Sequence, residues 1–256
     1  PAPAYGRLEE ADAMEGLARH LTDWIAAEVS GAGGRGAVFG LSGGLDSAVV
    51  AALAKRAFPH HTLGVIMPCH SDPRDAEDAS VVAHHFDIPS CTVDLAPVYD
   101  LMLERLSVCS SDFCDSRLAT ANLKPRLRMT TLYAFANQLD YRVLGTGNRS
   151  ELALGYFTKY GDGGADFLPL GSLVKSEVRD LARHLGVPDR IITKPPSAGL
   201  WADQTDEAEM GLTYEELDAY LLTSEASPAV KAKVDAMHAA SQHKRELPPI
   251  APKPGA

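Results

Sequence analysis

Cysteine is scarce in the sequence, and long apolar runs are absent from it. The 256 residues include four cysteines without paired C-x-x-C spacing or a histidine partner motif, which argues against a zinc site and favours free thiols. No apolar stretch approaches the roughly 18 residues that a membrane helix needs, and the N-terminus lacks a basic-then-apolar signal pattern. We therefore expect a cytoplasmic protein without a membrane partner.

Positive charge is also in short supply. The chain has 24 Lys and Arg residues against 34 Asp and Glu residues, which gives a net charge of −10 and disfavours nucleic acid as a partner. An anionic substrate must therefore meet a local positive patch. The length allows a sizeable core, and we expect one domain over residues 1–256 that ends in a short, flexible, proline-rich tail.

A glycine-rich turn between an apolar run and a helical pattern organises the sequence. The run ending at Leu41 fits a buried strand, and apolar residues recur at helical spacing from Val49 to Ala57. Glycines at the start of a helix let a phosphate approach unpaired N–H groups. No lysine follows the glycines, so other residues or a metal must neutralise the phosphate, and Asp46 is the candidate metal ligand. Alternatively, the glycines form only a tight turn and Asp46 only caps the helix.

The complete string Ser42-Gly43-Gly44-Leu45-Asp46-Ser47 narrows these alternatives. It resembles the pyrophosphate-binding loop of the ATP pyrophosphatases. This resemblance implies that the protein activates a carbonyl or carboxylate group as its adenylate and releases pyrophosphate.

Strand and helix patterns alternate along the chain. This alternation predicts an α/β fold with a doubly wound parallel sheet flanked by helices. Ligands of such sheets bind beyond the carboxyl ends of the strands, where Ser42 and Thr146 are expected to lie. A polar surface loop is expected over 107–116. The predicted strands cover 37–41, 62–67, 91–94 and 141–145, and the main predicted helices cover 8–29, 48–57, 76–86, 122–139, 175–185 and 228–240.

Two irregular stretches interrupt this alternation. Residues 155–171 are glycine-rich and cannot form a regular helix, and residues 194–207 begin with Lys194-Pro195-Pro196. A flexible linker is the simpler interpretation. Interleaved Lys, Tyr and Asp residues favour a substrate-binding loop in the first stretch.

Motifs distributed over residues 8–247 together resemble those of the NAD synthetases. After the glycine loop they are Thr146-Gly147-Asn148-Arg149-Ser150-Glu151, Phe157-Thr158-Lys159-Tyr160-Gly161-Asp162, Lys194-Pro195-Pro196-Ser197-Ala198, Gln204-Thr205-Asp206-Glu207 and His243-Lys244-Arg245. The resemblance implies an adenine nucleotide alpha-hydrolase-like fold and a C–N bond-forming ligase. ATP would adenylylate the nicotinate carboxylate of deamido-NAD, and ammonia would then displace AMP to give NAD.

The same resemblance assigns roles to individual residues. Asp46 and Glu151 would bind Mg²⁺, and Asp46 and Lys175 would act in catalysis. Arg126, Lys159, Asp166, His243 and Lys244 would hold deamido-NAD, which requires the C-terminal segment to fold back over the site. ATP would be bound by Gly40, Leu41, Ser42, Gly43, Gly44, Leu45, Asp46, Ser47, Thr146, Lys175 and Ser197.

The nitrogen donor and the oligomeric state follow from the resemblance as expectations. The residues before the first helix are too few for the glutaminase domain of fused homologues, so ammonia is the expected donor, and a separate glutaminase partner stays open. A homodimer is expected, as in the family, with the helices predicted at 8–29 and 122–139 as its candidate contact surface.

Two other functions are compatible with the glycine loop. One is adenylation of a different acceptor, as in tRNA-modifying or GMP-forming pyrophosphatases, although the net charge and the lack of paired catalytic cysteines oppose tRNA thiolation. The other is a nucleotide sensor without catalysis, which would not need Asp46, Glu151 and Lys175 together.

Overall fold

A parallel four-stranded sheet with strand order β3-β2-β1-β4 forms the centre of the structure. The structure is a computed structural model that describes residues 4–110, 115–197, 199 and 205–253. The strands are β1 (Gly36–Gly40), β2 (Thr62–Ile66), β3 (Ser90–Thr92) and β4 (Tyr141–Val143). This arrangement confirms the predicted doubly wound parallel sheet, with each observed strand within two residues of its predicted bounds.

Helices cover both faces of the sheet because side chains alternate between the faces along each strand. On β1, Ala37 and Phe39 belong to one apolar cluster, whereas Val38 belongs to another. The first cluster packs against α1 (Ala4–Gly31), α2 (Leu45–Ala57), α3 (Pro73–His85), α8 (Lys175–His184) and α9 (Asp189–Ile192). The second packs against α4 (Ala96–Cys109) and α6 (Leu123–Leu139).

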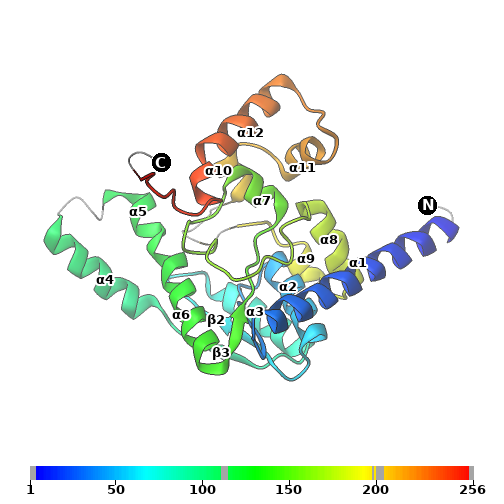
Figure 1. Ribbon diagram of the computed structural model, residues 1–256, viewed down its shortest axis with the longest axis horizontal. Helices are drawn as coiled ribbons and strands as arrows, with labels where there is room; N and C mark the ends of the chain where they lie inside the picture. Colours follow the sequence, from blue (N-terminus) through cyan, green and yellow to red (C-terminus); the bar gives the residue numbers. More distant parts are fainter. Residues whose placement is uncertain (1–3, 111–114, 198, 200–204, 254–256) are drawn as a thin grey trace.

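A third, smaller cluster joins helices from the C-terminal part of the chain to a short helix after β4. Leu154, Leu217 and Val234 are among its buried members. These helices lie together at the top of the view in Figure 1, above the sheet. They are α7 (Arg149–Leu154), α10 (Asp206–Met210), α11 (Tyr214–Thr223) and α12 (Pro228–Ala240). Two shorter elements, α5 (Arg117–Ala121) and η2 (Gln242–Lys244), complete the described structure.

The observed helices correct the sequence expectations in a few places. Helix α4 continues to Cys109, so a loop starting at residue 107 is wrong for its first residues; the Ser107 hydroxyl donates to the Glu104 carbonyl (2.8 Å) and so fits within the helix. Residues 111–114 of that predicted loop lie outside the described residues. Helix α1 is longer than predicted. None of the described helices is both long and apolar enough to cross a membrane.

Candidate active site

The carboxyl end of the sheet opens into a cavity of about 690 Å³. Its wall contains most of the residues that sequence motifs predicted for the site. They are Gly40, Leu41, Ser42, Gly44, Leu45, Asp46, Ser47, Arg126, Thr146, Glu151, Lys159, Lys175, Ser197, His243 and Lys244. Of the predicted set, Gly43 and Asp166 do not line the cavity. Segments more than 200 residues apart in the sequence thus converge on one site.

The glycine loop connects β1 to α2 at the floor of this cavity. Gly44 is the N-cap residue of α2 and offers no side-chain cap, so nothing of its own covers the first turn of the helix. The Ser47 hydroxyl donates to the Gly44 carbonyl (3.0 Å), and the Gly44 N–H donates to the Ser42 hydroxyl (3.2 Å). The loop is therefore held in shape by its own serines, with the positive end of α2 facing the cavity.

Gly43 is the loop residue that cannot be replaced without strain. Its φ is +74°, in the left-handed region, and a Cβ there would lie 2.4 Å from the Asp75 carbonyl oxygen and 2.7 Å from the Asp78 Cβ. The absence of a side chain lets α3 pack directly behind the loop. Gly43 therefore supports the phosphate site from its far side and does not line the cavity.

We expect Gly43→Ala to destabilise the fold by about 1–3 kcal/mol, because it combines backbone strain with a backbone clash. Pyrophosphate release should fall with it, since the loop must shift. Thermal unfolding measures the first effect. Gly16→Ala is the matched control, because a Cβ at Gly16 in α1 meets nothing within 4 Å and should leave stability equal or higher. Equal melting temperatures for Gly43→Ala and the wild type would contradict this expectation.

Asp46, Glu151 and Lys175 form a buried ion cluster beside the loop. Lys175 Nζ lies 2.5 Å from Asp46 Oδ2 and 3.5 Å from Glu151 Oε1, and the Lys175 side chain is only 4% exposed. Asn148 donates from Nδ2 to Asp46 Oδ1 at 2.9 Å. Asp46 is thus in the first turn of α2 but does not cap it. This geometry corrects the alternative in which Asp46 is only a helix cap.

The cluster shifts the pKa of both kinds of group in it. Burial raises the pKa of Glu151 to about 8, against the lowering effect of Lys175. Burial alone would lower the pKa of Lys175, but the charges of Asp46 and Glu151 outweigh it and raise that pKa above its ordinary value. Lys175 is therefore held as a cation beside Asp46 and Glu151.

Short helices place Glu151 and Lys175. In α7 the Asn148 side chain accepts from the Glu151 N–H (3.0 Å), and Glu151 Oε2 accepts from the Asn148 N–H (3.2 Å), which completes a capping box. At the start of α8 the Lys175 N–H donates to the Ser150 hydroxyl (3.1 Å), which donates to the buried Asp218 carboxylate (2.6 Å). These hydrogen bonds join α7, α8 and α11 around the ion cluster.

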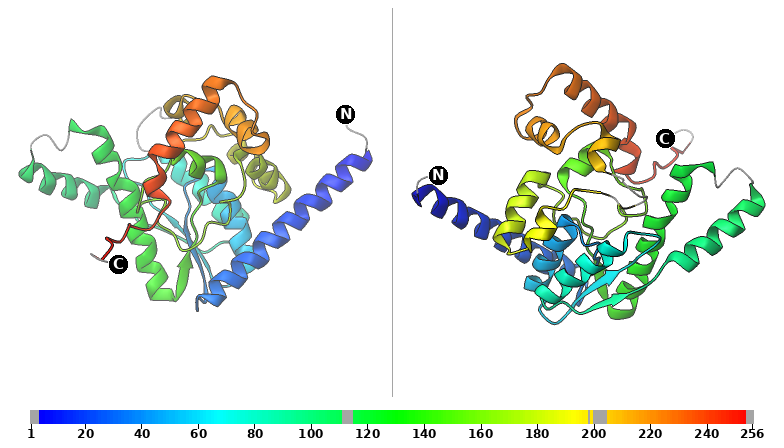
Figure 2. Two further views of the ribbon diagram at one scale, coloured as in Figure 1. Left: turned by 45° about the horizontal axis from the view of Figure 1, so that its top comes forward. Right: turned by 180° about the vertical axis from the view of Figure 1, so that it is seen from behind.

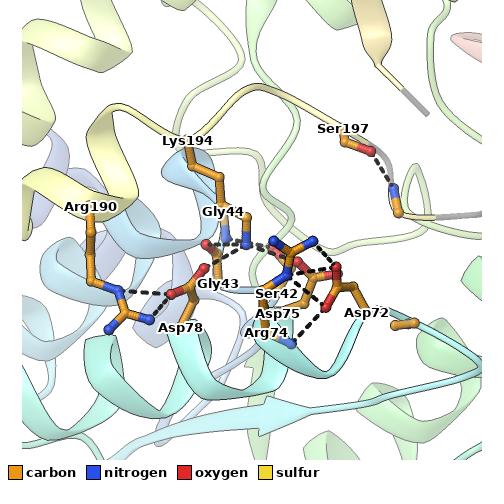
Figure 3. Close-up of polar contacts among 12 residues, drawn as sticks. Ser42, Gly43, Gly44, Asp72, Arg74, Asp75, Asp78, Arg190, Lys194 and Ser197 are labelled. Carbon is orange, nitrogen blue, oxygen red and sulfur yellow. Dashed lines mark hydrogen bonds and ion pairs between the residues drawn. The ribbon is translucent and has the colours of Figure 1, made fainter. Parts of the chain in front are cut away.

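A second ion cluster supports the glycine loop from behind. Lys194 Nζ donates to Asp75 Oδ1 (2.8 Å) and Asp78 Oδ2 (2.7 Å) and lies 3.4 Å from the Gly43 carbonyl oxygen (Figure 3). Arg190 donates through Nε to Asp78 Oδ1 at 2.9 Å. Two cations from the segment after α8 therefore neutralise the carboxylates of α3 next to the phosphate site. Ser197 follows three residues after Lys194 and also lines the cavity.

The opposite wall gathers the cations predicted for deamido-NAD. The C-terminal segment does fold back: Lys244 Nζ donates to the carbonyls of Gly155 (2.7 Å) and Phe157 (2.8 Å). Lys159 Nζ donates to the His243 carbonyl. Arg126 is exposed, with Nη2 3.4 Å from the Lys159 carbonyl oxygen.

Two residues near this wall, Pro125 and Asp166, help to shape the backbone there. Pro125 stands in the first turn of α6, where its missing N–H has no intrahelical partner to lose, so the helix begins at Leu123 and not later. Asp166 accepts from the Val143 N–H (2.8 Å) and the Tyr133 hydroxyl (3.0 Å), which ties the glycine-rich stretch to β4 and α6. A substrate role for Asp166 stays a prediction.

Several residues of the site were not singled out from the sequence. Asn148, Lys194 and Asp206 stand inside motifs that were recognised, but nothing local to those motifs says which side chains face the ion clusters. The sequence positions of Asp75 and Asp78 are typical of the polar face of a surface helix. Among the described residues no group of three or more His, Cys, Asp or Glu side chains is arranged to hold a metal.

The parallel sheet, the glycine loop beyond β1 and the cavity at the carboxyl ends of the strands define a nucleotide-binding α/β protein with the adenine nucleotide alpha-hydrolase-like fold. Comparison with known proteins gives its family. The family model described as NAD synthase matches residues 17–248. The chain belongs to the NAD synthase family, as the sequence motifs indicated.

Individual relatives agree with this assignment. The chain is 51% identical over 230 residues to a protein of Carboxydothermus hydrogenoformans named NH3-dependent NAD+ synthetase, a match that covers 90% of this chain and 94% of the relative. A structure of NMN synthetase from Francisella tularensis superposes with a TM-score of 0.88 at 38% identity, covering 95% and 99% of the two chains. An NH3-dependent NAD synthetase from Campylobacter jejuni superposes with a TM-score of 0.77 at 30% identity, covering 93% and 99%.

Proposed function

We propose that the chain is an ammonia-dependent NAD synthetase, a ligase that converts ATP, deamido-NAD and ammonia to AMP, pyrophosphate and NAD. The observation that carries this proposal is the buried cluster of Asp46, Glu151 and Lys175 beside the glycine loop, in a chain of the NAD synthase family. A nucleotide sensor would have no need for these three charges next to the phosphate site. The matching curated relatives are named NH3-dependent NAD+ synthetase, which supports ammonia as the nitrogen donor and NAD as the product.

The first step activates a poor electrophile. An oxygen of the nicotinate carboxylate attacks the α-phosphorus of ATP, the bond to pyrophosphate breaks, and a mixed anhydride with AMP forms. The loop residues Ser42 to Ser47 would hold the phosphates on the N-terminal end of α2. Lys175 would then stabilise the negative charge that develops during the transfer. In the second step ammonia attacks the carbonyl carbon, and AMP leaves.

Asp46 and Glu151 fit a magnesium ion. Both are carboxylates at one side of the cavity, and Mg²⁺ in nucleotide sites commonly uses one or two carboxylates together with phosphate oxygens. When bound, it would neutralise charge on the triphosphate. Lys175 would exchange its two carboxylate partners for phosphate oxygens.

The deamido-NAD site is proposed at the wall formed by Arg126, Lys159, His243 and Lys244. These residues bring positive charge to a protein with a net charge of −10, as binding of a dinucleotide diphosphate requires. Asp166 would act by holding the glycine-rich stretch in place.

A second candidate activity is the amidation of a mononucleotide. It is favoured by the TM-score of 0.88 to the structure of NMN synthetase, which exceeds the 0.77 to the NH3-dependent NAD synthetase. Both activities use the same chemistry on a nicotinate carboxylate and differ in the size of the acceptor.

One set of assays tests both candidates. Pyrophosphate and amide formation are measured with ATP and Mg²⁺, with deamido-NAD or nicotinate mononucleotide as acceptor and ammonium or glutamine as donor. A larger kcat/KM for deamido-NAD with ammonium supports the NAD synthetase, whereas a larger value for the mononucleotide supports the second candidate. Product from glutamine only after a glutaminase is added would show that a separate partner can supply ammonia.

We also propose that the protein is a homodimer that uses α4. This helix leads away from the sheet on the side opposite α1 (Figure 2). Its residues Val98, Leu101 and Met102 recur at helical spacing and are 49%, 51% and 39% exposed. Leu118 on α5 is a further exposed apolar residue, 67% exposed, and lines the cavity. A second copy of the chain would cover this surface and close the acceptor site.

Leu101→Glu should weaken the dimer at least tenfold, roughly the effect of placing a charge in an apolar contact. Light scattering after size exclusion, at a series of protein concentrations, measures the mass. Leu222→Glu on α11 is the control, because Leu222 is similarly exposed at 52% but lies on another surface. A wild-type protein that is monomeric at every concentration would contradict the proposed dimer.

A further inference from the structure

Asp206 is a buried acidic residue at the cavity that the proposed reaction has not yet used. It is 4% exposed and lines the cavity at the start of α10. Its Oδ2 accepts from the Tyr214 hydroxyl at 3.0 Å. Its Oδ1 has no hydrogen-bond partner, and among the described residues it is the one buried side-chain polar atom in that condition. A buried acceptor of this kind costs free energy unless a ligand satisfies it.

Asp206 lies in a negatively charged part of the cavity, which attracts cations. Lys175 Nζ lies 5.1 Å above the centre of the Tyr214 ring, so the same tyrosine contacts both the ion cluster and Asp206. Asp46, Glu151 and Asp206 are three carboxylates that act electrostatically on a single lysine. Asp206 thus extends the negative side of the reaction site beyond the two proposed magnesium ligands.

The backbone and Tyr214 hold Asp206 in place. The Asp206 N–H donates to the Pro196 carbonyl (3.2 Å), and the neighbouring Glu207 carboxylate accepts from the Tyr214 N–H (2.8 Å). Burial raises the pKa of Asp206, against the lowering effects of Lys175, Tyr214 and Tyr156, which makes its carboxylate a better proton acceptor. A fixed, basic and poorly hydrated carboxylate is suited to bind and deprotonate a nucleophile.

We propose that Asp206 Oδ1 is the binding group for the ammonia nucleophile. This inference rests on the proposed function. The ammonium ion donates a hydrogen bond to Oδ1 and passes one proton to the carboxylate. The nitrogen then forms its bond to the carbonyl carbon of the adenylate, the C–O bond to the phosphate breaks with its electron pair leaving on AMP, and the second proton passes to solvent. Oδ1 is covered from bulk water in this structure, so the nucleophile reaches it after a local rearrangement of the cavity wall.

The test separates the two half-reactions. Asp206→Asn should raise the KM for ammonium at least about tenfold, the effect of losing a hydrogen bond to a charged group, and should lower kcat for amide formation. Pyrophosphate–ATP exchange that depends on deamido-NAD, measured without ammonium, should stay within about threefold of the wild type because the adenylate forms before Asp206 acts. The ratio of AMP to NAD produced should rise as the adenylate is lost to water.

Asp235→Asn is the matched control. Asp235 accepts from the Tyr220 hydroxyl at 2.9 Å, the same kind of tyrosine–aspartate pair, outside the cavity. It should leave both half-reactions unchanged. Asp206→Ser is the second variant. Each change removes a buried charge, so neither variant should have a lower melting temperature than the wild type. Loss of a purely structural carboxylate would lower the melting temperature.

Two results would overturn the inference while the function stands. One is an unchanged KM for ammonium in both Asp206 variants. The other is a loss of exchange equal to the loss of amide formation, which would make Asp206 a counter-ion of Lys175 in the first step. A wild-type protein without deamido-NAD-dependent pyrophosphate release would instead refute the proposed function, and the inference with it.

Discussion

Asp46→Asn should reduce pyrophosphate release and NAD formation by at least about 10³-fold. The change removes the negative charge of the side chain that is proposed to bind the metal and to position Lys175. The amide can still accept from Asn148, which reaches Asp46 Oδ1 at 2.9 Å, so the side chain keeps its place. The variant therefore changes the charge and not the shape of the site. Asp46→Ala should have an effect at least as large.

The fold should survive this change with reduced stability. Lys175, only 4% exposed, would keep Glu151 at 3.5 Å as its remaining partner. Removal of one partner from a buried ion pair costs up to about 3–5 kcal/mol, and the second carboxylate and the cavity water reduce this cost. Far-ultraviolet circular dichroism should match the wild type while the melting temperature falls.

A surface pair supplies the control for Asp46. Lys55 and Asp87 also form a lysine–aspartate pair, at 3.3 Å, but the Asp87 side chain is fully exposed. Asp87→Asn should change stability by less than about 1 kcal/mol and leave turnover intact. If Asp46→Asn turned over substrate within tenfold of the wild type, roughly the effect of one ordinary hydrogen bond, Asp46 would have no metal role.

The glycine loop and the parallel sheet could be predicted because their signals are local. Glycines before a helix, apolar runs of strand length and helical spacing all act within a few residues of one another. The strand ends then follow from the alternation of elements. This is why Ser42, Thr146 and Glu151 were expected at one edge of the sheet, where the structure has them.

The partners inside the site could not be predicted in the same way. Lys175 meets Asp46 across 129 residues of sequence, and Lys194 meets Asp75 across 119. The carboxylate with which each lysine forms an ion pair depends on the angle at which α8 and α3 approach the loop. Hydrophobic periodicity does not encode that angle. The resemblance to a family supplied roles for Asp46 and Lys175 without their geometry, and it supplied none for Lys194 and Asp75.

Two smaller details also show that sequence patterns do not give the contacts of individual side chains. A substrate role for Asp166 stays a prediction, but no sequence signal indicated that its carboxylate also accepts from Tyr133 and from the Val143 N–H at the buried edge of β4. Helix α4 runs past its expected end because a serine hydroxyl can return its hydrogen bond to the preceding turn. Polar residues alone do not distinguish a loop from the last turn of an exposed helix.

Lys175→Met should lower kcat for pyrophosphate release by about 10²–10³-fold, the range found when one group that stabilises transition-state charge is removed. Methionine has a similar length and fits the buried position, so packing against Tyr214 should persist. KM for ATP should rise less than kcat falls, because the lysine in the free protein is already occupied by two carboxylates. Rapid-quench measurement of the first turnover separates this step from product release.

The same variant should steepen the loss of stability with rising pH in the metal-free protein, which the raised Glu151 pKa already causes in the wild type. Burial raises the pKa of Glu151 from 4.5 to about 8 even with Lys175 beside it, and without the lysine this pKa rises further. The native state then holds a proton that the unfolded chain releases near pH 4.5, so stability falls as the pH increases above that value and continues to fall through the raised pKa. The melting temperature of Lys175→Met should therefore drop between roughly pH 6 and pH 9 by more than that of the wild type. The additional drop should lie roughly between the Glu151 pKa in the native wild type and the higher Glu151 pKa in the native variant.

Added Mg²⁺ distinguishes this origin from a general loss of packing. If the two carboxylates repel each other in Lys175→Met, a divalent cation between them should restore the melting temperature at the higher pH, and should do little for the wild type, where the lysine already neutralises them. Sodium chloride at equal ionic strength controls for screening. A variant whose stability depends on neither pH nor Mg²⁺ would mean that Asp46 and Glu151 do not form one cation site, and the magnesium assignment would fail together with the electrostatic role of Lys175.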